Sequence, residues 1–177
     1  MAQIEVPSSD VSTGSWSANS GSTLYTQIDE GSVHSDSDWI ESTDNGTDDT
    51  CEVHITDPDT PFQSGNYYIK YRAKVDQSFM FANPNMQVQL MQGATQIDTF
   101  TDTGITTSYT NDSYEVTDVS GISDWTDLRF KITMKTDGMG GGGALYLSNI
   151  YFEVPDQDSG SGSAKIPVTL FINGMST

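Results

Sequence analysis

Apolar and polar residues alternate one by one along several short segments of the chain. In "NYYIKYRAKV", residues 66–75, the cations all occupy even-numbered positions, and mostly apolar residues occupy the odd-numbered positions. Residues 126–135, "TDLRFKITMK", repeat this pattern, and shorter versions occur in "TCEVHIT" and "MQVQLMQ". Successive side chains of a strand point to opposite faces, so the pattern predicts strands with one buried face and one wet face. Such strands are typical of antiparallel sheets.

Five further segments have the composition of strands and are separated by turn residues. They are "STLYTQI", "SDWIES", "TQIDTFT", "DSYEVTDV" and "ALYLSNIYFEV". The stretch "LMQGATQI" predicts a hairpin that turns near Gly93. Around Ser148 and Asn149 the apolar residues switch from odd-numbered to even-numbered positions, which predicts a β-bulge or burial on both faces. No segment has a convincing helical period, although "VSGISDWTDL" has room for one helical turn. Roughly nine short strands therefore predict an all-β fold, an antiparallel β-sandwich of jelly-roll type.

The composition of the chain changes after Pro155. Gly, Ser and Asp dominate the following stretch, "DQDSGSGSA", and such a composition is typical of flexible linkers. The remaining residues again alternate between apolar and polar. We therefore expect a β-sandwich over residues 1–156, a linker over 157–164 and a separate C-terminal arm over 165–177.

The expected arm has the pattern of one extended strand. Its apolar residues are Ile166, Val168, Leu170, Phe171 and Ile172. Pro167 lacks a backbone N–H, which suits a strand at the edge of a sheet. An apolar strand left in water is an aggregation hazard, so we expect the arm to be buried. It either folds back onto its own sandwich or adds a strand to a second protein, and the sequence leaves both open.

The charge of the chain limits its partners. The 177 residues include 25 acidic and 7 basic side chains, which give a net charge of −18. Such a surface repels phosphate backbones and anionic lipid head groups, so we expect neither nucleic acid nor a membrane as a partner. Cys51 is the only cysteine, which excludes an intramolecular disulfide. The chain shows neither a secretion signal nor an apolar run of membrane-spanning length, so we expect synthesis in a reducing cytoplasm.

The side chains that most enzymes use for covalent or acid–base chemistry are scarce. His34 and His54 are the only histidines, and neither lies in a nucleophile motif. Cys51 has the pattern of a small core residue. Paired carboxylates for glycoside cleavage stay open, but acidic residues are too abundant here to be informative. We therefore expect no enzymatic activity and no cofactor.

Acidic residues cluster between residues 36 and 59. Within this region "DNGTDD" places Asp44, Asp48 and Asp49 around a glycine, which makes them candidates for calcium binding. Their spacing lacks the alternate ligands and the terminal glutamate of an EF-hand, so a solvated turn explains the cluster more simply. We therefore expect no metal site.

The seven basic residues follow a sharper pattern. Six of them occupy the outward positions of only two predicted strands, and the seventh opens the arm. They are Lys70, Arg72 and Lys74 in the first strand, Arg129, Lys131 and Lys135 in the second, and Lys165 in the arm. If the two strands shared a sheet, the cations would form a stripe that docks on an acidic partner. The alternative is pairing with carboxylates of the same chain.

Three tryptophans lie in polar surroundings. Trp16, Trp39 and Trp125 occur in "GSWSA", "SDWIE" and "SDWTD". Each could stack on a sugar ring, because an aromatic face packs well against an apolar sugar face. Each could equally plug the edge of the sandwich, which is the usual place of a lone tryptophan near a strand.

Six stretches together carry a resemblance to a known family. They are "GSTLYTQIDE", "CEVHITDPDTP", "YIKYRAKV", "VQLMQGATQID", "ISDWTDLRFKIT" and "LSNIYFEVP". From about Trp16 to Pro155 the chain resembles an uncharacterised β-sandwich module encoded among the structural genes of tailed bacteriophages. The resemblance implies a sandwich on the virion surface, either a capsid decoration (cement) protein or an appended domain of a tail protein. It includes no catalytic motif, and the arm has no counterpart in it.

Two hypotheses of different classes follow. In the first, the protein decorates the capsid exterior of a virion, and the arm and the cationic stripe bind the major capsid protein and other copies of the chain, for example in a trimer. In the second, it is a carbohydrate-binding module of a phage tail or receptor-binding apparatus, and the tryptophans contact the glycan. From the sequence and the resemblance we favour the first.

Overall fold

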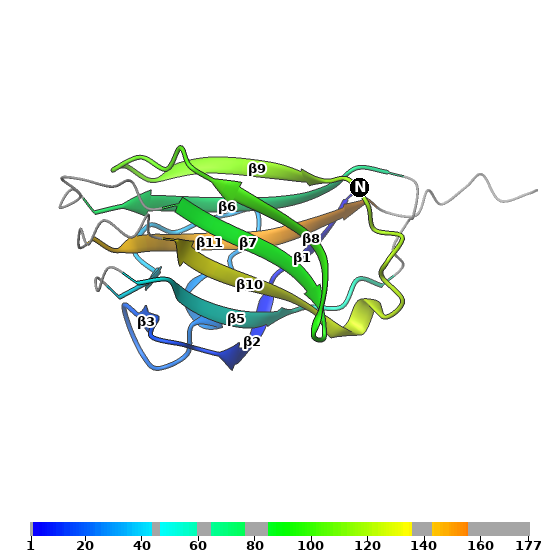
Figure 1. Ribbon diagram of the computed structural model, residues 1–177, viewed down its shortest axis with the longest axis horizontal. Coiled ribbons are helices and arrows are strands. Elements are labelled where there is room, and N and C mark those ends of the chain that lie inside the picture. The colour runs from blue at the N-terminus through cyan, green and yellow to red at the C-terminus, as the bar shows by residue number, and fades with distance from the viewer. Residues whose placement is uncertain (1, 44–46, 60–64, 77–84, 136–142, 156–177) are drawn as a thin grey trace, which may run out of the picture.

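Two antiparallel sheets pack face to face (Figure 1). The computed structural model describes residues 2–43, 47–59, 65–76, 85–135 and 143–155. Almost all regular secondary structure in these residues is β-strand. The exceptions are two short 3₁₀ turns, η1 (Tyr25–Gln27) and η2 (Trp125–Asp127). The prediction of an all-β antiparallel sandwich is confirmed.

We call the two layers sheet A and sheet B. Sheet A has the order β3-β4-β11-β6-β9, and β1 also pairs with β11. Its strands are β1 (Ala2–Glu5), β3 (Ser17–Ala18), β4 (Ile40–Glu41), β6 (Tyr67–Val75), β9 (Thr110–Val116) and β11 (Leu145–Pro155). Sheet B has the order β2-β5-β10-β7-β8. Its strands are β2 (Pro7–Ser12), β5 (Asp49–Ile55), β7 (Asn85–Gln92), β8 (Thr95–Asp102) and β10 (Leu128–Lys135).

The apolar positions of the alternating strands fill the space between the sheets. Every second residue of β5 and β6 is buried, as their patterns predict. Phe130 of sheet B and Phe152 of sheet A are fully buried, and Tyr67 stacks on Phe152 with ring centroids 5.8 Å apart. Burial of each large apolar side chain contributes about 1.5–3 kcal/mol. This core fixes two outer faces on opposite sides of the molecule.

Three local predictions are confirmed. The hairpin between β7 and β8 turns at Gly93, whose φ of 54° lies in the left-handed region that favours glycine. The register between β11 and β6 shifts between Leu147 and Asn149, which is the expected β-bulge. The single helical turn within residues 119–128 is η2.

The N-terminal region differs from the predicted pattern. Residues 22–28 were expected to be a strand but contain η1. The cause is Asp10, whose carboxylate accepts hydrogen bonds from the backbone N–H groups of Leu24 and Tyr25, each at 2.9 Å. The alternation pattern does not predict β1 and β2, because "AQIE" and "PSSDVS" have no regular apolar face.

The segment between η1 and β4 lies against the outer face of sheet A, and we call its residues 29–39 the cover loop. β1 and β4 pair with different ends of β11, so the backbone of Ile150 between them needs another partner. Its N–H donates to the carbonyl of Ile28 at 3.4 Å. Gly31 then turns the chain with a φ of 64°, which favours glycine. The cover loop thus begins at the centre of sheet A.

The predicted linker and arm, residues 157–177, lie outside the described residues. The domain boundaries and the destination of the arm therefore stay predictions. Within the parts of the chain that the structure describes, no helix is long and apolar enough to cross a membrane.

Candidate functional site

Aromatic side chains gather on the outer face of sheet A. Tyr68 of β6 and Tyr146 and Tyr151 of β11 hold outward positions and are half-buried. Trp39, the last residue of the cover loop, meets Tyr146 edge to face with ring centroids 6.4 Å apart. Tyr109, just before β9, is also half-buried. These five rings come from four different segments, and the pairing of β6, β9 and β11 brings them onto one face.

All three cations of β6 lie against these rings, and the Arg72 guanidinium is 5.5 Å from the ring centroid of Tyr109. The Lys70 ammonium is 5.6 Å from the ring centroid of Tyr68. The Lys74 ammonium is 4.6 Å from the ring of Tyr109 and 5.0 Å from that of Tyr146. The negative face of an aromatic ring attracts a cation at such distances. Each contact therefore helps to fix both the ring and the cation on the face.

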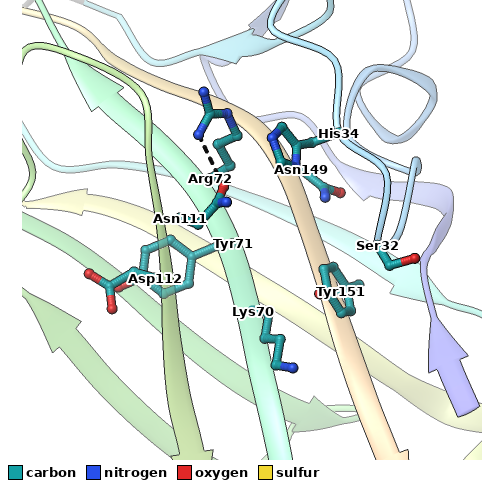
Figure 2. Close-up of a pocket in the computed structure, with 9 residues that line it drawn as sticks. All are labelled: Ser32, His34, Lys70, Tyr71, Arg72, Asn111, Asp112, Asn149 and Tyr151. Carbon is teal, nitrogen blue, oxygen red and sulfur yellow. Dashed lines mark hydrogen bonds between the residues drawn. The ribbon is translucent and has the colours of Figure 1, made fainter. Parts of the chain in front are cut away.

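A pocket of about 120 Å³ lies between the strands and the cover loop (Figure 2). Strands β6, β9 and β11 form its floor, and the cover loop forms one wall. Its lining residues are Ser32, His34, Lys70, Tyr71, Arg72, Asn111, Asp112, Asn149 and Tyr151. Pockets that enclose a whole small molecule are about 300–1,000 Å³. This pocket therefore suits one part of a ligand whose remainder lies on the open face.

Arg72 connects the cover loop to two strands of sheet A. Its Nε donates to Oδ1 of Asp36 at 2.6 Å, and its Nη2 donates to Oδ2 at 2.7 Å. Its Nη1 donates to Oδ1 of Asn111 on β9 at 3.1 Å, the bond drawn in Figure 2. Two parallel charge-assisted bonds give a fixed geometry. The hydrogen bonds from Arg72 also lower the pKa of Asp36, so this carboxylate stays charged and keeps the loop in place.

Asn149 connects the cover loop to the β-bulge of β11. The bulge changes which residues of β11 point outward. The side chain of Asn149 lies in the pocket wall with only 2% of its surface exposed. Its Nδ2 donates to the carbonyl of Gly31 at 2.5 Å. Its Oδ1 is buried and has no hydrogen-bond partner among the described residues. An unpaired buried acceptor costs about 1–3 kcal/mol, so the hydrogen bond from Nδ2 that ties the bulge to the cover loop is made against this cost.

Lys70 and Glu153 form an ion pair beside the pocket. The Lys70 Nζ is 2.7 Å from Oε2 of Glu153, and both side chains are partly covered. The hydrogen bond to Glu153 raises the pKa of Lys70, so the lysine stays protonated. Lys70 has three donors and uses one of them here, which leaves donors for a ligand.

The cationic stripe does not form, because its two strands lie in different sheets. β6 belongs to sheet A and β10 to sheet B, so their cations face opposite sides of the molecule. Most of them pair within the chain instead. Arg129 contacts Glu52 at 3.2 Å and Asp127 at 2.9 Å, and Lys135 contacts Asp48 at 2.7 Å. The predicted arm residues, including Lys165, lie outside the described part of the chain.

The three tryptophans have different environments. Trp16 is 4% exposed and belongs to the core, so it plugs the sandwich and has no free face for a sugar. Trp125 stacks on Tyr67 with ring centroids 5.8 Å apart and packs against the core. Trp39 alone of the three contacts the aromatic group on sheet A. The tyrosines of this face were not predicted as site residues, although the alternating pattern places them on the outward positions of β6 and β11.

The calcium candidates have structural partners. Asp44 lies outside the described residues. Asp48 pairs with Lys135. Asp49 is buried and accepts hydrogen bonds from the backbone N–H groups of Ser15 and Thr43, at 3.1 and 2.9 Å. Among the described residues, no group of three or more carboxylate, histidine or cysteine side chains has the geometry to hold a metal ion.

The candidates for covalent chemistry are dispersed. His34 lines the pocket on sheet A, whereas His54 lies on β5 of sheet B. Cys51 is fully buried, and burial raises the pKa of its thiol well above the usual value. A protonated, inaccessible thiol is a poor nucleophile. Asp112 is the only carboxylate among the residues that line the pocket, whereas glycoside hydrolysis requires two.

Comparison with known proteins shows a likeness in fold only. No protein-family model matches the chain, and no curated protein matches it. A solved structure described as "xylan-binding module CBM15" is 14% identical and has a TM-score of 0.51, and the match covers 89% of this chain and 99% of that one. An arabinose-bound MgGH51 α-L-arabinofuranosidase is also 14% identical with a TM-score of 0.51. That match covers 87% of this chain but 27% of the arabinofuranosidase.

These likenesses agree with a jelly-roll β-sandwich. They support the fold that the resemblance to phage modules implies, and they give no support to a phage capsid origin. The capsid partner, the self-association and the virion location therefore stay predictions.

Proposed function

We propose that the protein is a non-catalytic carbohydrate-binding module and that a glycan binds the outer face of sheet A. One observation carries the proposal: the face combines a pocket with polar lining residues and half-buried rings, because Tyr151 lines the pocket and Tyr68 and Tyr146 hold outward positions on the same strands β6 and β11. A sugar ring has an apolar face of C–H groups and a rim of hydroxyl groups. The rings would receive the first and the pocket the second.

The polar groups of the pocket are suited to hydroxyl groups. Ser32 and Asn111 supply neutral groups that both donate and accept, and Lys70 supplies donors. The bonds of Arg72 to Asp36 and Asn111 hold the cover loop before any ligand arrives. Such preorganisation reduces the entropy lost on binding.

Two further observations support binding rather than catalysis. The pocket has one carboxylate where a glycosidase needs two. The similar structure with nearly complete mutual coverage is described as a xylan-binding module. Capsid decoration is the weaker candidate, because neither the stripe nor a similar structure supports it.

The proposal is tested by changing Tyr68, Tyr146 and Tyr151 to alanine, one at a time, and measuring binding to a glycan array and by titration calorimetry. Loss of one stacking ring should weaken binding roughly 3- to 10-fold. The control is Gln89→Ala on β7 of sheet B, which should bind like the wild type. Unchanged thermal unfolding would show that the variants are folded. Binding that survives all three tyrosine changes would contradict the proposed face.

A further inference from the structure

We infer that the outer face of sheet A selects uncharged glycans and discriminates against acidic ones. The inference rests on the proposed function and concerns its substrate class. Three cations lie on this face of a strongly acidic molecule, and at first sight they suggest a site for uronates or sulfated sugars. Their contacts indicate the opposite.

Two of the cations already have carboxylate partners. Arg72 makes two bonds to Asp36, at 2.6 and 2.7 Å. Lys70 makes one to Glu153, at 2.7 Å. An acidic sugar would have to displace these carboxylates or bind a pair whose charge is already balanced. Displacement of Asp36 would also release the cover loop, which forms the wall of the pocket.

The third cation, Lys74, lies against the rings of Tyr109 and Tyr146. Near it, strand pairing places Glu41 opposite Tyr146 on the same face. At the other end of the face, Glu115 lies opposite Tyr68. The face therefore has more carboxylates than cations.

The net charge of −18 acts in the same direction. A ligand carboxylate about 4 Å from a protein carboxylate meets a repulsion of roughly 1 to 4 kcal/mol near a protein surface. An uncharged sugar avoids this repulsion. Its hydroxyl groups both donate and accept, so they suit the neutral side chains of Ser32 and Asn111 in the pocket.

The experiment compares two kinds of probe by titration calorimetry. The uncharged probes are xylan and galactan, and the acidic probes are polygalacturonate and heparin. The wild type should bind at least one uncharged probe, and bind both acidic probes at least about tenfold more weakly. Affinity for the uncharged probe should change less than about twofold between roughly 20 and 200 mM salt.

A single isosteric change should alter the selection. Glu153→Gln removes the partner of Lys70, so affinity for an acidic probe should rise at least about fivefold at low salt. Glu52→Gln is the matched control, because it changes the net charge equally but removes a partner of Arg129 on sheet B. An equal gain in both variants would show an effect of net charge and would overturn the inference.

The remaining outcomes separate the inference from the function on which it rests. A wild type that binds an acidic probe as tightly as an uncharged one supports glycan binding but overturns the charge selection. A folded wild type that binds no probe of either kind overturns the proposed function, and the inference with it.

Discussion

The two outer faces of the sandwich are built on the same strand pattern but differ in content. The outer face of sheet A has aromatic rings, a pocket and a loop fixed across it. Among the outward residues of the described strands of sheet B, none is aromatic, and most are short polar or charged side chains. β6 and β10 illustrate the contrast, since both present Lys and Arg outward while only β6 lies among rings.

This difference indicates which face has a role beyond folding. The core needs the inward positions of both sheets and leaves the outward positions free. Sheet B shows that polar outward residues are sufficient for a stable sheet. The rings on sheet A are therefore not required by the sandwich, and half-buried aromatic rings beside a pocket are typical of binding surfaces.

The sharpest way to break the comparison is to remove the central arginine of each face. Arg72→Met should lower the free energy of unfolding by about 1–2 kcal/mol, because it removes a bidentate ion pair with Asp36 and a hydrogen bond to Asn111 that together hold the cover loop on the sheet. Arg129→Met should cost less than about 1 kcal/mol, since its ion pairs with Glu52 and Asp127 join segments that strand pairing already holds together and fix no loop. Chemical denaturation measures both. Hydrogen exchange should become faster in residues 29–39 only in Arg72→Met. Equal losses, or a cover loop that is unaffected, would contradict the special role of Arg72.

The long alternating strands of both sheets could be predicted, but the site could be predicted only in part. Period-two alternation identified β5, β6, β7 and β10 because inward burial is a local property of each strand. Which strands share a sheet depends on pairing between distant residues. For that reason Lys70 and Arg129 seemed able to form one stripe, although the fold places them on opposite faces.

The cover loop illustrates the same limit. Residues 29–39 have no periodic pattern, and their position depends on single contacts such as Asp36 with Arg72. Asn149 lines the pocket because a β-bulge changes the face to which its side chain points. The sequence indicated the bulge, but it did not indicate that Asn149 would contact Gly31 of the cover loop. The tyrosines were visible as outward residues. Their convergence with Trp39 required the fold.

A pH titration sharpens the comparison, because sheet A alone has the cover loop with its partly buried acid, Glu30. Burial raises the pKa of Glu30 to about 7, and Asp29 and Asp38 add to the shift. A carboxyl whose pKa is higher in the folded state than in the unfolded state favours folding while it is protonated. The contribution of Glu30 is therefore fully present below about pH 4.5 and is lost as the pH rises towards 7.

Glu30→Gln should flatten this part of the dependence, since glutamine stays neutral. Urea denaturation between about pH 4.5 and 8 measures it. Glu5→Gln should also flatten the dependence, because burial raises the pKa of Glu5, but this residue lies in β1 and contacts Thr56 instead of the cover loop, so the double variant should show the sum of two independent effects. A Glu30→Gln curve parallel to that of the wild type would show that Glu30 ionises normally in the folded protein.

The smallest expected effect concerns the lysine ion pairs of the two faces. Lys135 and Asp48 are both more than a third exposed, so Lys135→Met should change the free energy of unfolding by less than about 0.5 kcal/mol. Lys70 is less exposed, and it contacts both Glu153 and the ring of Tyr68. Lys70→Met should therefore cost more, about 1 kcal/mol.

Salt distinguishes the two pairs further. Raising the salt to about 1 M shortens the screening length to about 3 Å and should remove what little Lys135 contributes. Much of the Lys70 contribution should persist, because contact with a ring includes packing that salt does not screen. Denaturation of both variants at low and high salt gives the two differences. If the two lysines behaved alike at both concentrations, the charges on sheet A would be as loosely held as those on sheet B, and the preorganised face would lose its physical basis.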